Sequence, residues 1–218
     1  MSRVLPILFN TEMVRAILDG RKTSTRRSVK GKVLDILNSQ YHKEHPEVSD
    51  KMLIEKLCKA PYYPGDVLYI RETWSFLPCV ECMDEGSACN TDPVVYDDGD
   101  IESEGCFVYK ASHPRAGKVS WTPSIHMPKK AARIWLKIMD VRAERLQDIT
   151  GEEILTEGIV NKRSNPAMGK RWENMQKLEF ERLWDSTIKK SNVGTYDWAS
   201  NPWVWVIEFE RCERPEVS

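Results

Sequence analysis

The sequence predicts an α+β protein in which a mixed β-sheet or small β-barrel carries peripheral helices. Segments with strand character are separated by helical ones but do not alternate regularly with them, which disfavours a doubly wound parallel sheet. Residues 201–212, NPWVWVIEFERC, are apolar on both faces at the centre, as expected of a strand buried in a sheet. Residues 171–186 have the spacing of an amphipathic helix. Its expected apolar face comprises Trp172, Met175, Leu178, Leu183 and Trp184.

The length of 218 residues fits one domain, which we expect to span residues 1–218 with insertions at about 33–60 and 77–106. A net charge of −1 argues against a general attraction to polyanions. The charge is nevertheless unevenly distributed. Gly20 to Lys32 holds six Lys or Arg and no acid, whereas Glu81 to Glu104 holds nine Asp or Glu and no Lys or Arg. The basic segment is the part suited to a phosphate.

The N-terminal apolar run is too short for a signal peptide, and a Pro interrupts it. No run approaches the roughly 18 apolar residues that a membrane span requires. We therefore expect a cytoplasmic protein with no membrane partner. The six Cys are then expected to be thiols or metal ligands and not disulfides.

The elements of the first half follow from caps and breakers. Residues 3–9 predict a strand, and residues 10–20 predict a helix capped by Asn10 or Thr11 and ended by Gly20. Residues 24–31 are expected to be extended or turning. Residues 33–60 are expected to be helical, with Ser49 as a cap, and residues 65–74 predict a strand opened by a Gly-Asp turn.

The second half begins with residues 77–106, which show no periodicity and predict an inserted acidic loop that contains four of the Cys. Short and long strands are expected at 106–111 and 131–146, on either side of a Pro-bounded ordered loop at 120–130. Residues 148–159 predict a short helix. Thr150 and Glu153 have the spacing of a capping box, and Gly158 ends the helix.

The stretch GRKTSTRR, Gly20 to Arg27, has a structural and a functional interpretation. Its cations and hydroxyls are compatible with a solvated basic turn. Alternatively, a hydroxyl acts as a nucleophile beside a Lys base, because burial or neighbouring cations lower the pKa of a Lys. Lys22 and Thr25 are three residues apart, so a regular strand would place them on opposite faces. The functional interpretation therefore requires the segment to turn or bulge.

The stretch ILDGRKTSTRR resembles the signature GRKTxTxR of the ASCH family, whose domains are PUA-like mixed β-barrels. PGDVLYIRETW is similar to the family's Gly-Asp strand, and RAERLQDITGEEILTEGI to its short acidic helix. WVWVIEFE resembles the family's last strand. The similarity extends from about residue 5 to residue 211, and PSIHMPKKAARI with NPWVWVIEFE most resembles the larger members found in phages and prophages.

The resemblance implies an activity and a set of site residues. Some bacterial ASCH proteins are amidohydrolases that deacetylate N4-acetylcytidine with a Lys, a Thr and a Glu. Carried over by position, these are Lys22, Thr25 and Glu157, although a small gap in the alignment would select Glu152 or Glu153 instead. This chain is about twice as long as those enzymes. Other ASCH proteins are thought to bind RNA, and one kind to cleave it, so the alternatives are an RNA or modified-base binding module and a ribonuclease.

Further residues are candidates for substrate binding. Arg27 or backbone amides are candidates to stabilise an oxyanion, and Trp74 and Trp121 are candidates to stack on a base. Glu72 is a candidate for bonding a base edge, and His126, in the Ser-x-His pair with Ser124, for binding a ligand or moving a proton. The structural alternatives are that Trp74 lies in the hydrophobic core and that His126 belongs to an ordered loop, where its side chain hydrogen-bonds to the backbone. The full set of expected binding residues is Arg21, Arg27, Glu72, Trp74 and His126.

No cofactor is required by this chemistry. Cys79, Cys82, Cys89 and Cys106 supply four thiols in one insert, which suits a structural zinc ion. Strong zinc patterns contain two Cys-x-x-Cys pairs, however, and only one is present here. A reduced acidic loop is the favoured alternative, and the expected partner is a nucleoside or RNA.

Overall fold

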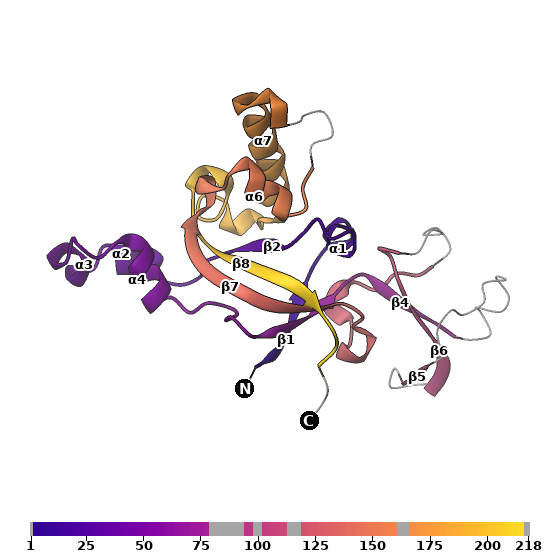
Figure 1. Ribbon diagram of the computed structural model, residues 1–218. Helices are drawn as coiled ribbons and strands as arrows, with labels where there is room; N and C mark the ends of the chain where they lie inside the picture. Colours follow the sequence, from indigo (N-terminus) through magenta and orange to yellow (C-terminus); the bar gives the residue numbers. More distant parts are fainter. Residues whose placement is uncertain (1, 79–93, 98–101, 113–118, 161–165, 216–218) are drawn as a thin grey trace. The chain divides into compact units, whose positions relative to one another are not determined.

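The computed structural model describes residues 2–78, 94–97, 102–112, 119–160 and 166–215. It confirms an α+β protein, with one five-stranded and one three-stranded sheet among these residues (Figure 1). The strands are β1 (Val4–Leu8), β2 (Ser24–Ser28), β3 (Val67–Arg71), β4 (Trp74–Pro78), β5 (Val94–Asp97), β6 (Glu102–Tyr109), β7 (Trp135–Arg145) and β8 (Trp203–Cys212). The α-helices are α1 (Thr11–Leu18), α2 (Val33–Leu37), α3 (Gln40–Glu44), α4 (Asp50–Leu57), α6 (Gly151–Thr156) and α7 (Lys170–Thr187).

The larger sheet has the strand order β1-β3-β7-β8-β2, and the smaller sheet has the order β4-β6-β5. Strand β2 pairs antiparallel with β8, so that Ser24 lies opposite Glu208 and Arg26 opposite Val206. The predicted burial of β8 is confirmed, since six of its first seven residues are buried. Strand β2 carries Arg26 and Arg27 along this apolar strand, where Ser24, Thr25 and Arg26 are buried.

The chain divides into two compact units. Unit 1 comprises Met1–Val4, Ala16–Val67 and Leu136–Cys212. Unit 2 comprises Leu5–Arg15, Leu68–Trp135 and Glu213–Ser218. The expectation of one domain stays a prediction, and each unit is described by itself below.

Unit 1 contains most of the sequence-predicted helices, and several of their predicted ends are confirmed. The side chain of Asn10, in unit 2, caps α1 at the amide of Met13 at 2.9 Å. Ser49 caps α4, and Thr150 and Glu153 form the expected capping box of α6. Helix α7 lies alongside α6 (Figure 1).

The apolar face expected for α7 is partly wrong. Its buried residues follow a spacing of four, and Leu178 is 48% exposed. The buried set is Trp172, Gln176, Phe180 and Trp184. Side chains four apart form one ridge of a helix, so the ridge that begins at Trp172 includes a polar Gln and excludes Leu178.

The prediction that 77–106 is a loop is wrong for part of its length. Strand β5 and the beginning of β6 lie in it, and Val94 pairs with Gly105. Valine and tyrosine favour strands, and VVY within the acidic run is sufficient for a short one. The strand expected at 65–74 is likewise two strands, β3 and β4.

The helical character expected at 33–60 is confirmed by α2, α3 and α4, and their description as an insertion stays a prediction. These helices surround a cavity of about 500 Å³ whose lining includes Ile36, Val48 and Leu53. Tyr41 and Leu57 also line it and are more than half exposed. No helix among the described residues is long and apolar enough to cross a membrane.

Candidate functional site

The backbone after α1 brings Lys22 beside the end of α6. Gly20 ends α1 with φ of 72°, and the amides of Arg21 and Lys22 both donate to Ala16 O, at 2.8 and 3.0 Å. The chain then runs along α6, where the amide of Thr23 donates to Thr156 O at 2.8 Å. Lys22 and Glu157 form an isolated antiparallel bridge. The turn at Gly20 therefore sets the distance between Lys22 and Glu157.

Gly158 permits the close approach of these segments. Its φ is 83°, a left-handed conformation that L side chains rarely adopt. A Cβ atom at this position would lie 2.7 Å from Ala16 Cβ and 2.9 Å from Lys22 Cβ. Glycine here both ends α6 after Glu157 and leaves room for the stem of Lys22.

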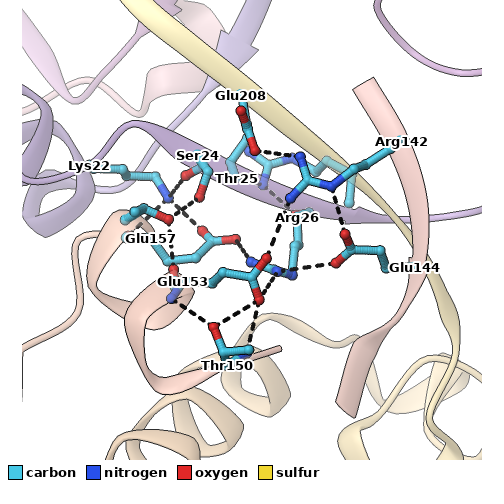
Figure 2. Close-up of polar contacts among 12 residues, drawn as sticks. Lys22, Ser24, Thr25, Arg26, Arg142, Glu144, Thr150, Glu153, Glu157 and Glu208 are labelled. Carbon is cyan, nitrogen blue, oxygen red and sulfur yellow. Dashed lines mark hydrogen bonds and ion pairs between the residues drawn. The ribbon is translucent and has the colours of Figure 1, made fainter. Parts of the chain in front are cut away.

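The ammonium group of Lys22 and the carboxylate of Glu157 form a buried ion pair. Lys22 Nζ lies 2.7 Å from Glu157 Oε2 and also donates to Glu157 O at 3.0 Å and to Ser24 O at 2.7 Å (Figure 2). Lys22 is 3% exposed and Glu157 is 5% exposed. Three hydrogen bonds are all that an ammonium group can donate.

The pKa of Lys22 lies below its ordinary value. Burial is the main cause, since it disfavours the charged ammonium, and Arg27 and Arg26 lower the pKa further by charge repulsion. Glu157 acts in the opposite direction through its charge and its hydrogen bond, but does not outweigh burial. The sequence left this competition open, and the structure resolves it towards a Lys that loses its proton more easily than usual.

Arg26 is a second cation on the Glu157 carboxylate, and the sequence analysis did not include it among the site residues. Its Nη1 lies 3.3 Å from Glu157 Oε1, and its side chain is 1% exposed. Its Nη2 lies 3.4 Å from Glu153 Oε2 and 3.5 Å from Glu144 Oε2. The alternation of a strand places Lys22, Ser24 and Arg26 at positions of one face, and this signal was available in the sequence.

Thr25 lies at the opposite face of β2 from Arg26, together with Arg27, whereas Lys22 and Arg26 reach Glu157 from the other face. The turn or bulge that the functional interpretation requires between Lys22 and Thr25 is therefore not seen. Its hydroxyl accepts a hydrogen bond from Arg27 Nη1 at 2.8 Å, and the residue is 1% exposed. The Arg27 charge lowers the pKa of Lys22, and the Glu157 charge raises that of Arg27, whose net pKa is lowered by burial. Arg27 therefore connects the hydroxyl of Thr25 electrostatically with the Lys22–Glu157 pair.

The structure distinguishes the three acids that the family alignment left open. Glu152 is exposed, and Glu153 accepts from the amide of Thr150 at 2.9 Å in the capping box. Glu157 is the acid in contact with Lys22. Arg21, by contrast, points to the surface, where it donates to Gly158 O and pairs with Asp19.

The remaining expected binding residues belong to unit 2. Glu72 is 1% exposed, and both of its oxygens accept from Arg133, at 2.8 and 3.1 Å. Trp74 is 5% exposed and packs edge-on against Phe107 at 5.6 Å between ring centroids. His126 is exposed at the end of a short 3-10 helix, Ser124–His126. The structural alternative is thus favoured for Trp74, while the exposed ring of His126 remains open to a ligand.

Most of the proposed zinc ligands lie outside the residues that the structure describes. Cys79, Cys82 and Cys89 lie outside the described residues, and Cys106 is buried in β6. Within the described ranges, no group of three or more His, Cys, Asp or Glu is arranged to hold a metal ion.

Comparison of the chain with family models, with curated proteins and with solved structures found no match.

Proposed function

We propose that this chain is an ASCH protein with a PUA-like barrel and that it hydrolyses the acyl amide of N4-acetylcytidine or a related acylated base. The observation that carries the proposal is the buried pair of Lys22 and Glu157, 2.7 Å apart, with the pKa of the Lys lowered. A Lys with a lowered pKa is a better candidate for a general base than an ordinary Lys. The basic stretch that includes it also matches the ASCH signature described above.

The chemistry assigns one task to each group. Thr25 Oγ1 attacks the acyl carbonyl carbon while neutral Lys22 takes the hydroxyl proton. The tetrahedral intermediate then collapses, the C–N bond breaks, and Lys22 returns the proton to the departing amino group of cytidine. Water hydrolyses the acyl-threonine ester and releases acetate. Arg27, already 2.8 Å from Thr25 Oγ1, stabilises the oxyanion.

This sequence of steps requires a change in the hydrogen bonds of Lys22. Its Nζ donates to Ser24 O and to two oxygens of Glu157, and a neutral amine has one donor fewer. The mechanism also requires the segment from Lys22 to Thr25 to turn when substrate binds, because the two side chains otherwise lie at opposite faces of the strand. The lone pair of the neutral amine then faces the hydroxyl of Thr25 or an attacking water. Catalytic hydrogen bonds often form only when substrate is bound.

A second candidate function rests on the same contacts. A Lys that donates three hydrogen bonds to protein acceptors is also what a purely structural ion pair requires. In that case the chain is a non-catalytic module that binds RNA or a modified base. A ribonuclease that uses the same Lys and Arg on a phosphate is the other alternative from the resemblance, and no contact among the described residues favours it.

Turnover of N4-acetylcytidine decides between these functions. The purified protein is incubated with the nucleoside, and release of cytidine and acetate is followed by chromatography. We expect turnover by the wild type and a loss of at least about a hundredfold in Lys22→Met, Thr25→Val and Glu157→Gln. If cytidine is not released and RNA binds with a steep salt dependence, the binding function replaces the hydrolase.

The signature stretch supplies matched controls. Thr23→Val makes the same change as Thr25→Val at an exposed hydroxyl two residues away. Lys30→Met removes an exposed cation from the same basic segment. Both controls are expected to retain wild-type turnover. Equal losses in Thr23→Val and Thr25→Val would refute the nucleophile assignment.

A further inference from the structure

One guanidinium group contacts both ends of the helix that carries Glu157. Arg26 Nη2 pairs with Glu153 in the first turn of α6, and Arg26 Nη1 pairs with Glu157 at the C-cap (Figure 2). These acids are four residues apart and therefore lie on the same side of the helix. Since Arg26 belongs to β2, its side chain holds α6 against the strand that follows Lys22 in the chain.

The two oxygens of the Glu157 carboxylate have different partners. Oε2 accepts from Lys22 at 2.7 Å, and Oε1 lies 3.3 Å from Arg26 Nη1. A carboxylate held at one oxygen can rotate about its last bond, whereas one held at both oxygens has a fixed plane. Arg26 is fixed in turn by Glu144 of β7, which also binds Arg142 at 2.6 Å.

We propose that Arg26 is a positioning residue, which fixes the Glu157 carboxylate on Lys22 by holding both ends of α6 to β2. This inference rests on the proposed hydrolase function for its effect on catalysis. Its effect on Lys22 is independent of that function. Arg26 occupies a position that varies in the signature GRKTxTxR, so the resemblance assigns it no role.

The charges around Lys22 determine the direction of the effect. Glu157 faces Lys22 from α6, and Arg26 and Arg27 face it from β2. Arg26 in turn faces Glu144, Glu153 and Glu157. Removing the Arg26 charge removes one repulsive cation and leaves the carboxylates less compensated. Both changes raise the pKa of Lys22, whereas a Glu157 carboxylate that is no longer held against Lys22 lowers it, so the test uses a variant that keeps the positive charge.

The test compares Arg26→Lys, in which one ammonium group keeps the charge but cannot hold Glu153 and Glu157 together, with the same substitution at Arg142, Arg142→Lys. Arg142 pairs with four acids, Asp140, Glu144, Glu153 and Glu208. It therefore shares Glu144 and Glu153 with Arg26, but among the described residues it forms no ion pair with Glu157. Lysine labelled with ¹³C and ¹⁵N reports the Lys22 pKa by NMR, and the signal is assigned by its loss in Lys22→Met. The acid limb of kcat/KM against pH is recorded in parallel.

We expect Arg26→Lys to lower the Lys22 pKa by about half a unit, because Glu157 is no longer held against its ammonium group, and to move the acid limb equally. Arg142→Lys is expected to move either quantity by about a third of that or less. A merely structural role for Arg26 would reduce the amount of folded protein without moving a pKa. An unchanged or raised Lys22 pKa in folded Arg26→Lys, or an equal fall in Arg142→Lys, overturns the proposal.

Two further results remain decisive. Should Arg26→Lys not fold, Arg26→Gln carries the test through a double-mutant cycle, because it removes the hold on Glu157 altogether. Glu157→Gln should lower the Lys22 pKa by less in Arg26→Gln than in the wild type, and an equal decrease in both backgrounds overturns the proposal. If the wild type does not hydrolyse the nucleoside, the proposed function fails, and the NMR pKa alone still decides the role of Arg26.

Discussion

Lys22 and Glu157 are 135 residues apart in the chain, yet their side chains form an ion pair of 2.7 Å that is almost completely buried. Breaking such a pair on one side leaves an uncompensated charge away from water. We expect Lys22→Met to lower the free energy of unfolding by about 3–5 kcal/mol. The double variant Lys22→Met/Glu157→Gln should lose less than the sum of the two single losses. Urea unfolding of all four proteins measures this coupling, and strict additivity would contradict it.

The lowered pKa of Lys22 also predicts a pH dependence of stability. Between its folded pKa and its ordinary value of 10.5, the unfolded chain binds the Lys22 proton and the folded chain does not. Stability therefore rises with pH in that window. The stability of the wild type relative to Lys22→Met should increase as the pH rises towards 10.5. Parallel urea titrations across this range would falsify the lowered pKa if the difference stayed constant or decreased.

Replacement of Gly158 is expected to disturb the site without touching a charged group. Alanine would have to adopt φ of 83° and place its Cβ within 3 Å of Ala16 and Lys22. We expect Gly158→Ala to cost at least about 2 kcal/mol of stability. Gly194→Ala is a matched control, because that glycine also has positive φ but no atom within 4 Å of the added Cβ. Thermal unfolding of the pair separates backbone strain from crowding, and similar losses would mean that crowding is unimportant.

Asp66 anchors the turn that opens β3, and its effect depends on pH. Its carboxylate accepts from the amide of Tyr63 at 2.8 Å and pairs with Arg3, whose hydrogen bond is the main reason that the Asp66 pKa is lowered. A lowered folded pKa gives stability that is present above the ordinary value of 3.8 and is lost as the pH falls through the folded pKa. Asp66→Asn should cost about 1–2 kcal/mol at pH 7. The difference from wild type should shrink towards pH 2, as measured by chemical unfolding.

Metal analysis tests the zinc hypothesis directly. We expect protein purified without added zinc to contain much less than one equivalent, because the Cys-x-x-Cys pair at Cys79 is the only one in the sequence. About one equivalent of zinc that is lost in Cys79→Ser would contradict this expectation. Cys58→Ser serves as the control, since that buried thiol belongs to α4 and the helical insertion.

Local signals in the sequence were sufficient for much of the fold. The cap at Asn10 and the capping box at Thr150 depend on residues three apart, so spacing alone identifies them. Strand β8 was recognisable because both of its faces are apolar. Each of these features depends on residues within a single element. It can therefore be recognised without knowing which other elements pack against that element.

Features that depend on several elements were not predictable in this way. In the sequence, Arg26 is one more cation in a basic segment. Its place in the candidate site depends on its ion pairs with acids on β7 and α6. Gln176 is polar, but its place on the ridge of α7 buries it. Strand β5 is hidden among acids that suggested a loop. In each case the outcome depends on a neighbour far away in the chain.

The same limit applies to the candidate site. The resemblance implied Lys22, Thr25 and Glu157 as a group, and the contact of Lys22 with Glu157 agrees with that grouping. Whether Glu157 keeps Lys22 charged or burial favours its neutral form depends on how deeply the side chain is buried. The spacing of residues in the sequence does not encode that depth. The link from Thr25 through Arg27 is likewise a matter of side-chain direction on a particular strand.

Helix α6 is only six residues long, and its last carbonyl, Thr156 O, accepts the amide proton of Thr23 at 2.8 Å. Because Lys22 is only 3% exposed, a bulky molecule can contact its amine only after neighbouring segments move, and detachment of this short helix from the segment before β2 is one such movement. That detachment breaks the Thr23 hydrogen bond, so hydrogen–deuterium exchange at this amide records how often the helix detaches. The frequency of this opening then limits any turnover that depends on it, however favourable the chemistry.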